Sequence, residues 1–119
     1  MTRSPARFLP WLLSLLCGWL LLMSPAWAET TADPASATAA QLFETHCVGC
    51  HVGGGNIVRR GKNLKQRALQ RHGVDSVEAI AELITHGKGL MSAYGDRLTA
   101  EEIDQLATYV WQRSQTNWQ

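Results

Sequence analysis

The sequence has almost no excess of charge and no pattern typical of β-strands. Its 119 residues contain 11 Lys and Arg against 10 Asp and Glu, for a formal net charge of +1, which does not indicate a nucleic-acid-binding surface. Strict alternation of apolar and polar residues, internal repeats and low-complexity segments are also missing. A chain of this length has room for one domain, and these absences favour a small all-α fold.

Cysteine and methionine are scarce, with three of each in the chain. Residues 1–28 have a basic start, an apolar run and an Ala-x-Ala end, which together predict a signal peptide. An uncleaved membrane anchor over the same run is the alternative. Cleavage before Glu29 would remove Cys17 and change the net charge from +1 to −1, because Arg3 and Arg7 are lost. We therefore expect an exported protein that keeps Cys47, Cys50 and a single methionine, Met91.

The rest of the chain divides into a lead-in and one domain. Residues 29–37 are small and polar and contain Pro34, so we expect a flexible lead-in before a domain over 38–119. Apolar spacing predicts helices over 38–47 and 64–71, a third from Asp75 or Ser76 to Gly87, and a fourth to about Gln115. The fourth opens with the capping box Thr99-x-x-Glu102 and carries Ile103, Leu106, Ala107, Val110 and Trp111 on one stripe.

The loops between these predicted helices are long and rich in glycine. The stretches "HVGGGNIVRRGKN" and "GKGLMSAYGDRL" hold most of the 10 glycines and show no helical periodicity. So much loop leaves too little apolar surface for a small domain to build its own core. We expect a prosthetic group to fill the middle of the fold.

The stretch "CVGCH", Cys47 to His51, indicates what that group is. Two thiols at this spacing can add to the two vinyl groups of a haem, and the adjoining histidine can bind the iron. A thioredoxin-like redox pair would need a preceding strand, and a zinc site would have to use His46 together with the motif. A plain disulfide is the remaining alternative. The motif favours one covalently bound haem c.

A haem iron ligated by His51 has one further axial position. Met91 lies outside any amphipathic stripe, between Gly89 and Gly95, where a loop could place its thioether over the open haem face. His72 and His86, each near a predicted helix end, are the alternatives. We expect Met91 to be the second axial ligand.

The residues from Thr38 to Trp118 resemble a class I cytochrome c, and within that class the cytochrome c6 family. The matching stretches are "LFETHCVGCHVGGGN", "LKQRALQRHGVDSVEAI" and "HGKGLMSAYGDRLTAEEIDQLATYVWQRSQTNW". The resemblance implies an all-α cytochrome c fold, with about four short helices wrapped around a covalently attached haem. It assigns Cys47 and Cys50 as thioether anchors and His51 and Met91 as axial ligands, and it brings Phe43 and Tyr109 into contact.

The same resemblance implies a function. The protein would be a soluble, monomeric one-electron carrier and not an enzyme, working in the thylakoid lumen or the periplasm. It would take electrons from cytochrome b6f to photosystem I or to a terminal cytochrome oxidase. The alternatives are a haem c subunit of a periplasmic dehydrogenase or oxidase and a small haem enzyme, which would need an open iron position.

Two features differ from the usual family sequence. The ligand loop usually reads Met-Pro-Ala-Phe, whereas this chain has Ser92 and Tyr94 at the second and fourth positions. Many members carry a Gln close to the haem where this chain has Leu83. Aliphatic residues at this position occur in side branches of the family, which implies a lower midpoint potential.

The charged residues are separated along the chain. Between Thr45 and Val74 there are basic residues but no acid: Arg59, Arg60, Lys62, Lys65, Arg67 and Arg71. From Asp75 to Asp104 acids dominate: Asp75, Glu78, Glu82, Asp96, Glu101, Glu102 and Asp104, against Lys88 and Arg97. These runs are either simply solvated faces or a dipole that orients the protein toward a redox partner.

Overall fold

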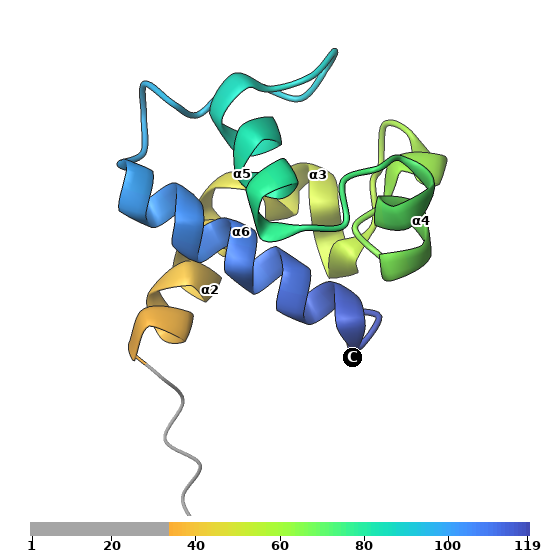
Figure 1. The fold of residues 1–119 in the computed structure, drawn as a ribbon, viewed down its shortest axis with the longest axis horizontal. Helices are drawn as coiled ribbons and strands as arrows, with labels where there is room; N and C mark the ends of the chain where they lie inside the picture. The colour runs from red at the N-terminus through yellow and green to blue at the C-terminus, as the bar shows by residue number, and fades with distance from the viewer. Residues whose placement is uncertain (1–33) are drawn as a thin grey trace, which may run out of the picture. The chain divides into compact units, whose positions relative to one another are not determined.

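The part of the chain that the structure describes is built from helices. The computed structural model describes residues 34–119, so the predicted signal peptide, 1–28, and residues 29–33 of the predicted lead-in lie outside the described residues. Figure 1 shows the element order. The helices are α2 Pro34–His46, α3 Val48–His51, α4 Gln66–Arg71, α5 Val77–His86 and α6 Ala100–Gln115, with 3₁₀ turns η2 Val52–Gly54 and η3 Arg60–Lys62.

The all-α prediction is confirmed. Within residues 34–119 the β-structure consists of one isolated bridge, between Lys88 and Met91, which lies in the segment predicted as an ordered loop. No helix in this range is long and apolar enough to cross a lipid bilayer. The four predicted helices correspond to α2, α4, α5 and α6, and α3 is a short addition that the sequence pattern did not predict.

Two predicted helix starts are wrong by a few residues. Helix α2 begins at Pro34 instead of Thr38, because proline has the φ of a first helical residue and the alanines after it are strong helix formers. The last residues of the predicted lead-in therefore belong to α2. Helix α4 begins at Gln66, two residues later than predicted, because the Asn63 side chain accepts a hydrogen bond from the Lys65 amide at 3.1 Å and forms a turn there.

The starts of α5 and α6 agree with the sequence. Ser76 caps α5 by accepting a hydrogen bond from the Ala79 amide at 3.2 Å. At α6 the Thr99 hydroxyl accepts from the Glu102 amide at 3.2 Å, and the Glu102 carboxylate accepts from the Thr99 amide at 2.8 Å. The predicted capping box is therefore formed.

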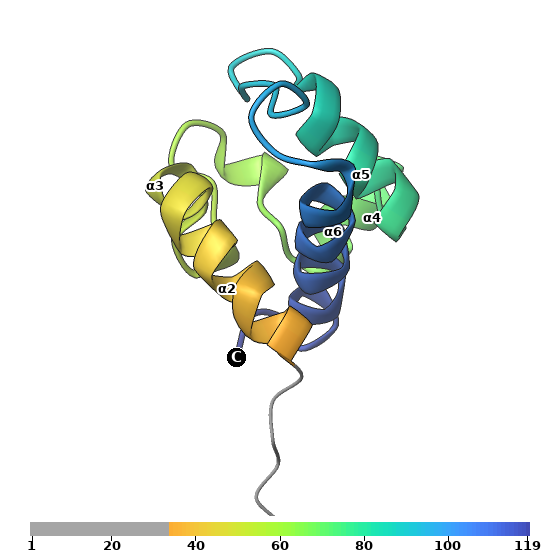
Figure 2. The same ribbon diagram turned by 90° about the vertical axis from the view of Figure 1, so that its left-hand side faces the viewer.

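Helix α6 is the central packing element and contacts both α2 and α5 (Figures 1 and 2). Its residues at the predicted stripe are buried, except that Trp111 is 37% exposed and its indole N–H donates to Asp75 O at 3.1 Å. Ser114, one turn further along, is buried in place of an apolar residue. The core joins residues from α2, α4, α5, α6 and the loop before α6: Phe43, Leu69, Ile80, Ile84, Leu98, Ile103, Leu106, Ala107 and Val110.

An aromatic cluster joins the C-terminus to the first helix and to the loop after the motif. Phe43 lies 5.6 Å from Tyr109 between ring centroids, which confirms their expected contact. Trp118 lies 4.9 Å from Phe43, and its indole N–H donates to Leu64 O at 2.9 Å. A Cβ at Gly54 would overlap this indole, so glycine lets the loop pass close under the Trp118 ring.

Candidate haem-binding site

The end of α2 and the short helix α3 hold the Cys-x-x-Cys-His motif in helical backbone. The Cys47 amide donates to Phe43 O at 2.8 Å, and the His51 amide donates to Cys47 O at 2.9 Å. Residues three and four apart lie on one face of a helix, so this backbone directs Cys47, Cys50 and His51 to the same side. One helical turn carries both thiols and the imidazole.

His51 is oriented by a hydrogen bond to the loop that follows it. Its Nδ1 lies 2.9 Å from Gly55 O, and because a carbonyl oxygen only accepts, Nδ1 carries the proton and Nε2 keeps a free lone pair. Gly53 and Gly54 form this turn with φ of 57° and 71°, a left-handed conformation that favours glycine. A second nitrogen bonded to backbone is typical of a metal-ligating histidine.

Met91 lies in the loop after α5, which Gly87 makes possible. Gly87 ends α5 with φ of 67°, and a Cβ there would lie 2.5 Å from Met91 O. The Lys88 amide donates to Met91 O at 3.1 Å, and the Met91 amide donates to Lys88 O at 3.2 Å. This tight turn folds Met91 back against the end of α5.

These two segments line one cavity of about 410 Å³. The motif contributes Cys47, Cys50 and His51 to its wall, and the loop after α5 contributes Met91. Apolar lining comes from Leu64, Ala68, Leu69, Val74, Leu83 and Leu90, and polar lining includes Asn56, Arg59, Lys62, Asn63, His72 and Lys88. The structure thus brings together all four residues selected from the sequence, with Leu83 beside them.

The chemistry of this lining fits a haem. Cys47 and Cys50 are free thiols, as thioether formation requires, and His51 and Met91 offer an imidazole and a thioether, a common axial pair in cytochromes c. The apolar residues suit the faces of the macrocycle, and Arg59, Lys62 and Lys88 have the charge that complements its two carboxylates. The c-type haem that the motif predicts is therefore chemically compatible with this cavity.

The thiols do not have the character of a redox-active pair. Burial, and then the charge of neighbouring Cys50, raise the pKa of the Cys47 thiol from 9.0 to about 11, whereas the nucleophilic cysteine of such pairs has a lowered pKa. In the described chain a helix, α2, precedes the motif where a thioredoxin-like site would have a strand. The thioredoxin-like alternative therefore does not fit.

A bare metal site does not fit either. Among residues 34–119 no three His, Cys, Asp or Glu side chains gather closely enough to hold a metal ion, so the zinc alternative at His46, Cys47, Cys50 and His51 has no support in the geometry. Cys47 and Cys50 are not joined by a disulfide in the described structure.

The two alternative axial histidines lie in different places. His86 is exposed and lies 3.3 Å from a Glu82 carboxylate oxygen, and it is not part of the cavity wall. His72 does line the cavity, but its Nε2 is hydrogen bonded to Gly61 O at 3.1 Å. His72 and Met91 therefore both line the cavity, and Met91 shows no side-chain hydrogen bond within the described chain.

Sequence reasoning missed Tyr94 as a site residue. Tyr94 lines the cavity, and its hydroxyl donates to His46 O at 2.8 Å, directly before the motif. The available signal was an aromatic residue three positions after Met91 in a loop predicted to be ordered. No local pattern indicates that its partner is a carbonyl 48 residues earlier.

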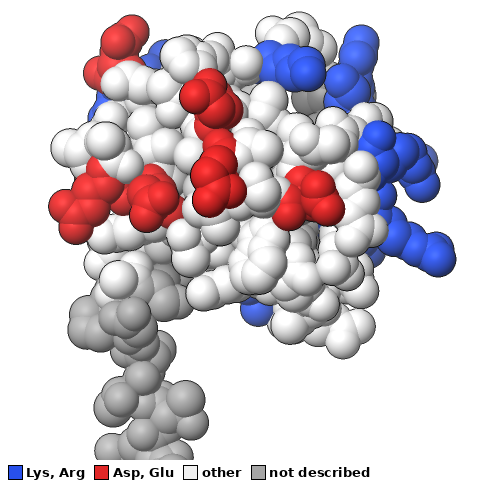
Figure 3. Space-filling view, viewed as in Figure 1, with Lys and Arg blue, Asp and Glu red and all other residues white. Residues whose placement is uncertain are grey.

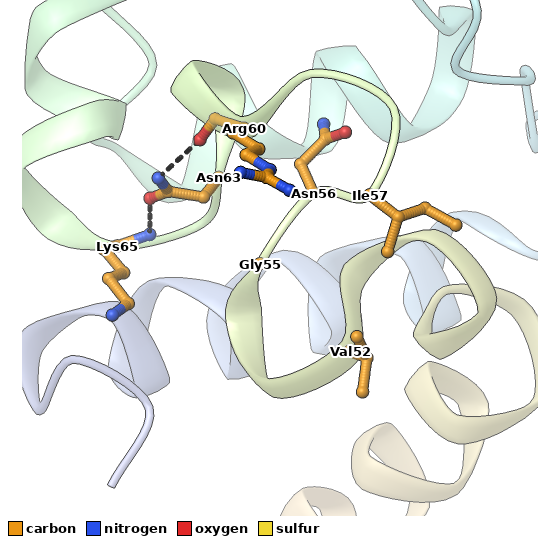
Figure 4. A pocket seen from close by; sticks show the side chains of 7 residues that line it. All are labelled: Val52, Gly55, Asn56, Ile57, Arg60, Asn63 and Lys65. Atoms are coloured by element: carbon orange, nitrogen blue, oxygen red, sulfur yellow. Dashed lines mark hydrogen bonds between the residues drawn. The ribbon is translucent and has the colours of Figure 1, made fainter.

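Figure 4 shows a second hollow in the described chain. It has a volume of about 420 Å³ and shares Asn56 and Asn63 with the main cavity. Its other lining residues are Val52, Gly55, Ile57, Arg60 and Lys65. In Figure 4, Asn63 bridges the backbone of Arg60 and Lys65, at 2.9 and 3.1 Å. It contains none of the four candidate haem residues.

The fold and the site define the class of protein. An all-α domain in which a Cys-x-x-Cys-His turn and a methionine-bearing loop line one largely apolar cavity is a class I c-type cytochrome. The family model described as subunit III of cbb3-type cytochrome c oxidase matches residues 34–110.

Individual relatives narrow the assignment. A cytochrome c6-like protein of Nostoc sp. (strain PCC 7120 / SAG 25.82 / UTEX 2576) is 46% identical over 97 residues, covering 82% of this chain and 83% of that protein. The crystal structure of cytochrome c6C from Synechococcus sp. PCC 7002 is 64% identical, with a TM-score of 0.65, covering 66% of this chain and 96% of that one. That of cytochrome c6B from Synechococcus sp. WH8102 is 49% identical, with a TM-score of 0.68, covering 71% and 96%.

The chain belongs to the cytochrome c6 family. Members of this family are electron carriers with a c-type haem and not enzymes, so the chain is a cytochrome c6-type electron carrier. Its similarity to the c6-like, c6B and c6C proteins agrees with the side-branch features seen in the sequence.

Proposed function

We propose that this chain carries one electron at a time with a single haem c, attached through Cys47 and Cys50 and ligated by His51 and Met91. The observation that carries the proposal is the meeting of these four side chains, from two distant segments, at one cavity. When bound, the haem supplies the reversible ferric–ferrous couple.

The residues of the chain have separate parts in this proposal. His51 presents Nε2, because its Nδ1 proton is held by Gly55 O. Met91 supplies a soft thioether ligand that favours a fairly high midpoint potential. Leu69 and Leu83 form apolar wall that keeps water away from the iron, and such exclusion reduces the change in solvation when the iron changes charge.

Electron exchange would take place at the exposed rim of the cavity. Cys50 is exposed, and the apolar side chains of Val58 and Leu90 are 52% and 79% exposed at the same cavity. Arg59, Lys62 and Lys88 line it as well. An exposed apolar rim with cations around it suits brief contact with an acidic surface of a redox partner.

The partners we propose are cytochrome b6f as donor and photosystem I or a terminal cytochrome oxidase as acceptor, in the thylakoid lumen or the periplasm. The cytochrome c6 relatives support this choice. Export would depend on the predicted signal peptide, 1–28, and would give a mature N-terminus at Glu29, which N-terminal sequencing of the purified protein can check. We expect a monomer in solution.

A second candidate function is a haem subunit that stays bound to an oxidase. The match to the subunit III family model favours it, and a carrier domain and a docked subunit can share one fold. Sedimentation of the protein from its native membranes distinguishes the two, because a subunit remains with the membrane complex and a carrier is released.

The proposal is tested by haem attachment and ligation. In the Cys47→Ser/Cys50→Ser variant we expect no haem to remain on the denatured chain and no stable fold, since a domain this small needs the cofactor to complete its core. In Met91→Ala we expect the sulfur-to-iron charge-transfer band to disappear and the midpoint potential to fall. Haem staining after denaturing electrophoresis, absorption spectroscopy and redox titration measure these effects.

The matched control for Met91→Ala is Leu90→Ala. Leu90 is the neighbouring residue at the same cavity and is mostly exposed, so its truncation should leave the band in place. A double-cysteine variant that folds without haem, or an intact band in Met91→Ala, would contradict the proposed site.

A further inference from the structure

Tyr94 connects the two segments that face the cavity. Its hydroxyl donates a hydrogen bond of 2.8 Å to His46 O, and its ring meets the His46 ring edge-on with centroids 5.8 Å apart. His46 directly precedes Cys47, and Tyr94 lies three residues after Met91. One bond therefore joins the methionine loop to the end of α2, directly before the motif.

The other hydrogen bonds of this loop lead elsewhere. The Tyr94 amide donates to Ile84 O at 2.9 Å and the Gly95 amide to Thr85 O at 3.1 Å, which attach the loop to α5. The paired bonds of Lys88 and Met91 are internal to the loop. Among the described hydrogen bonds, only that of the Tyr94 hydroxyl links segment 88–95 to α2 or α3.

Met91 and Tyr94 pack against the hydrophobic core, but the residues around them are exposed. Leu90 and Ser92, on either side of Met91, are exposed, and Gly89 has a φ of 62° and no neighbour within 4 Å of a Cβ built on it. The Tyr94 ring is partly buried, with the Arg97 guanidinium 5.5 Å from its centroid. Exposed segments open at lower free-energy cost than the core, so the one hydrogen bond from this loop to the end of α2 is suited to keep Met91 close to the motif.

We propose that Tyr94 is a positioning residue that holds Met91 at the axial position of the haem iron through the hydrogen bond to His46 O. This inference rests on the proposed function, because it requires His51 and Met91 to be the iron ligands. Removal of the hydroxyl frees the loop to move away from the motif, so an external ligand competes more successfully with Met91. The hydrogen bond holds Met91 in the position for iron binding, and Tyr94 itself does not contact the iron.

The test uses the haem-loaded protein and its Tyr94→Phe variant, with imidazole as the competing ligand. Loss of the charge-transfer band during imidazole titration reports replacement of Met91. We expect the apparent affinity for imidazole to rise by roughly 2- to 12-fold in Tyr94→Phe, which is the ratio that a net hydrogen bond of about 0.5–1.5 kcal/mol corresponds to. The variant retains the ring and its contacts, and phenylalanine is the usual residue of the family here, so it should fold.

The matched control is Tyr109→Phe. Tyr109 packs against Phe43 and Trp118 in the aromatic cluster, and its hydroxyl has no hydrogen bond among the described contacts. This variant removes the same atom and should leave the imidazole affinity unchanged. Thermal unfolding of both variants separates a general loss of stability from a local loosening of Met91.

The outcomes separate this inference from the proposed function. A wild-type protein without a charge-transfer band would overturn both, since Met91 would then not be the ligand. A normal wild-type band, with the same imidazole affinity in Tyr94→Phe as in wild type, would overturn only the role of Tyr94. An equal rise in both tyrosine variants would also overturn it, because the effect would not depend on the bond to His46.

Discussion

Leu83 is the single residue that most directly relates the sequence to the expected redox behaviour. It lies on α5 and lines the cavity beside Met91, so at the proposed haem site its side chain would contribute to the environment of the iron. An aliphatic side chain offers no hydrogen bond to either oxidation state, whereas a polar one can stabilise one state over the other. The midpoint potential should therefore be sensitive to this position.

We expect Leu83→Gln to raise the midpoint potential by roughly 20–65 mV, because an amide at this place favours the reduced iron. The range follows from a net hydrogen bond of about 0.5–1.5 kcal/mol at about 59 mV per factor of ten for one electron. A redox titration of the wild type and the variant in one buffer measures the shift.

Leu90→Gln is the control for this substitution. It makes the same chemical change at the same cavity, but Leu90 is 79% exposed, so water already solvates the position and the midpoint should stay the same. A midpoint in Leu83→Gln that is unchanged or lower would rule out this account of the substitution.

At the level of secondary-structure elements, the stability of α6 depends on the capping of its first turn. The Thr99–Glu102 capping box satisfies amides that the first helical turn would otherwise leave unpaired. Helix α6 packs against α2 and α5, so the stability of this start affects the domain that holds the haem cavity.

We expect the capping box to make stability depend on pH. Hydrogen bonds from the Thr99 backbone amide and then the Thr99 hydroxyl hold the pKa of Glu102 below its ordinary value of 4.5. A carboxylate with a lowered folded-state pKa stabilises the fold above its unfolded pKa, and this contribution is lost as pH falls through the folded pKa. Urea unfolding from about pH 7 to about pH 3 measures this effect. We expect Glu102→Gln to be less stable than wild type at the upper end of this range. Its free energy of unfolding should then fall less than that of the wild type as the pH decreases.

Thr99→Ala removes the other half of the box and should lower the free energy of unfolding by about 0.5–2 kcal/mol. Glu101→Gln is the control, because Glu101 lies in the same first turn and its carboxylate accepts from Gln105 at 3.4 Å instead of from the cap. If Glu101→Gln reduced the pH dependence of the free energy of unfolding as much as Glu102→Gln does, the helix dipole and not the capping box would cause that dependence.

For the molecule as a whole, the charge separation of the sequence becomes a separation in space. Figure 3 shows Asp and Glu over the left and middle of one face, while most visible Lys and Arg gather at the right edge, on the side of α4. Within the described chain no Lys or Arg forms a salt bridge with an acid. Arg67 and Arg71 pair with no carboxylate of residues 34–119 and lie outside the cavity lining, so their field is available to a partner.

We expect the rate of electron transfer to photosystem I to fall with added salt, because exposed charges are screened over about 8–10 Å at physiological ionic strength. Neutralising Arg67 and Arg71 should flatten this dependence. Both arginines are exposed and neither lines the cavity, so the substitutions reduce the basic edge without disturbing the haem site. Flash-induced kinetics at increasing ionic strength measure the effect.

Arg97→Gln, compared with Arg67→Gln alone, controls for net charge. Arg97→Gln removes one positive charge from the acidic segment and not from the basic one. We expect the rate of electron transfer in this variant to depend on salt at least as steeply as in wild type. A rate of electron transfer that does not change with salt would contradict this prediction. The charged faces would then serve only to solvate the protein.

The sequence by itself determined the class of fold and the chemistry of the haem motif. Helix caps, glycine breaks and apolar periodicity act over a few residues, so α5 and α6 could be predicted closely and α2 and α4 to within a few residues. The spacing of Cys47, Cys50 and His51 is likewise local. The helix start at Pro34 was missed because its polar surroundings favoured a lead-in.

Only the tertiary structure decided how the distant parts meet. That Met91 and Leu83 line the same cavity as the motif, that Trp118 packs over Gly54, and that the Tyr94 hydroxyl reaches His46 O all depend on the packing of α6 against α2 and α5. Such contacts have no local signature, since each is fixed by the relative placement of helices and not by the residues next to it in the chain. The burial of Ser114, a polar residue one turn after Val110, likewise shows only in the folded structure.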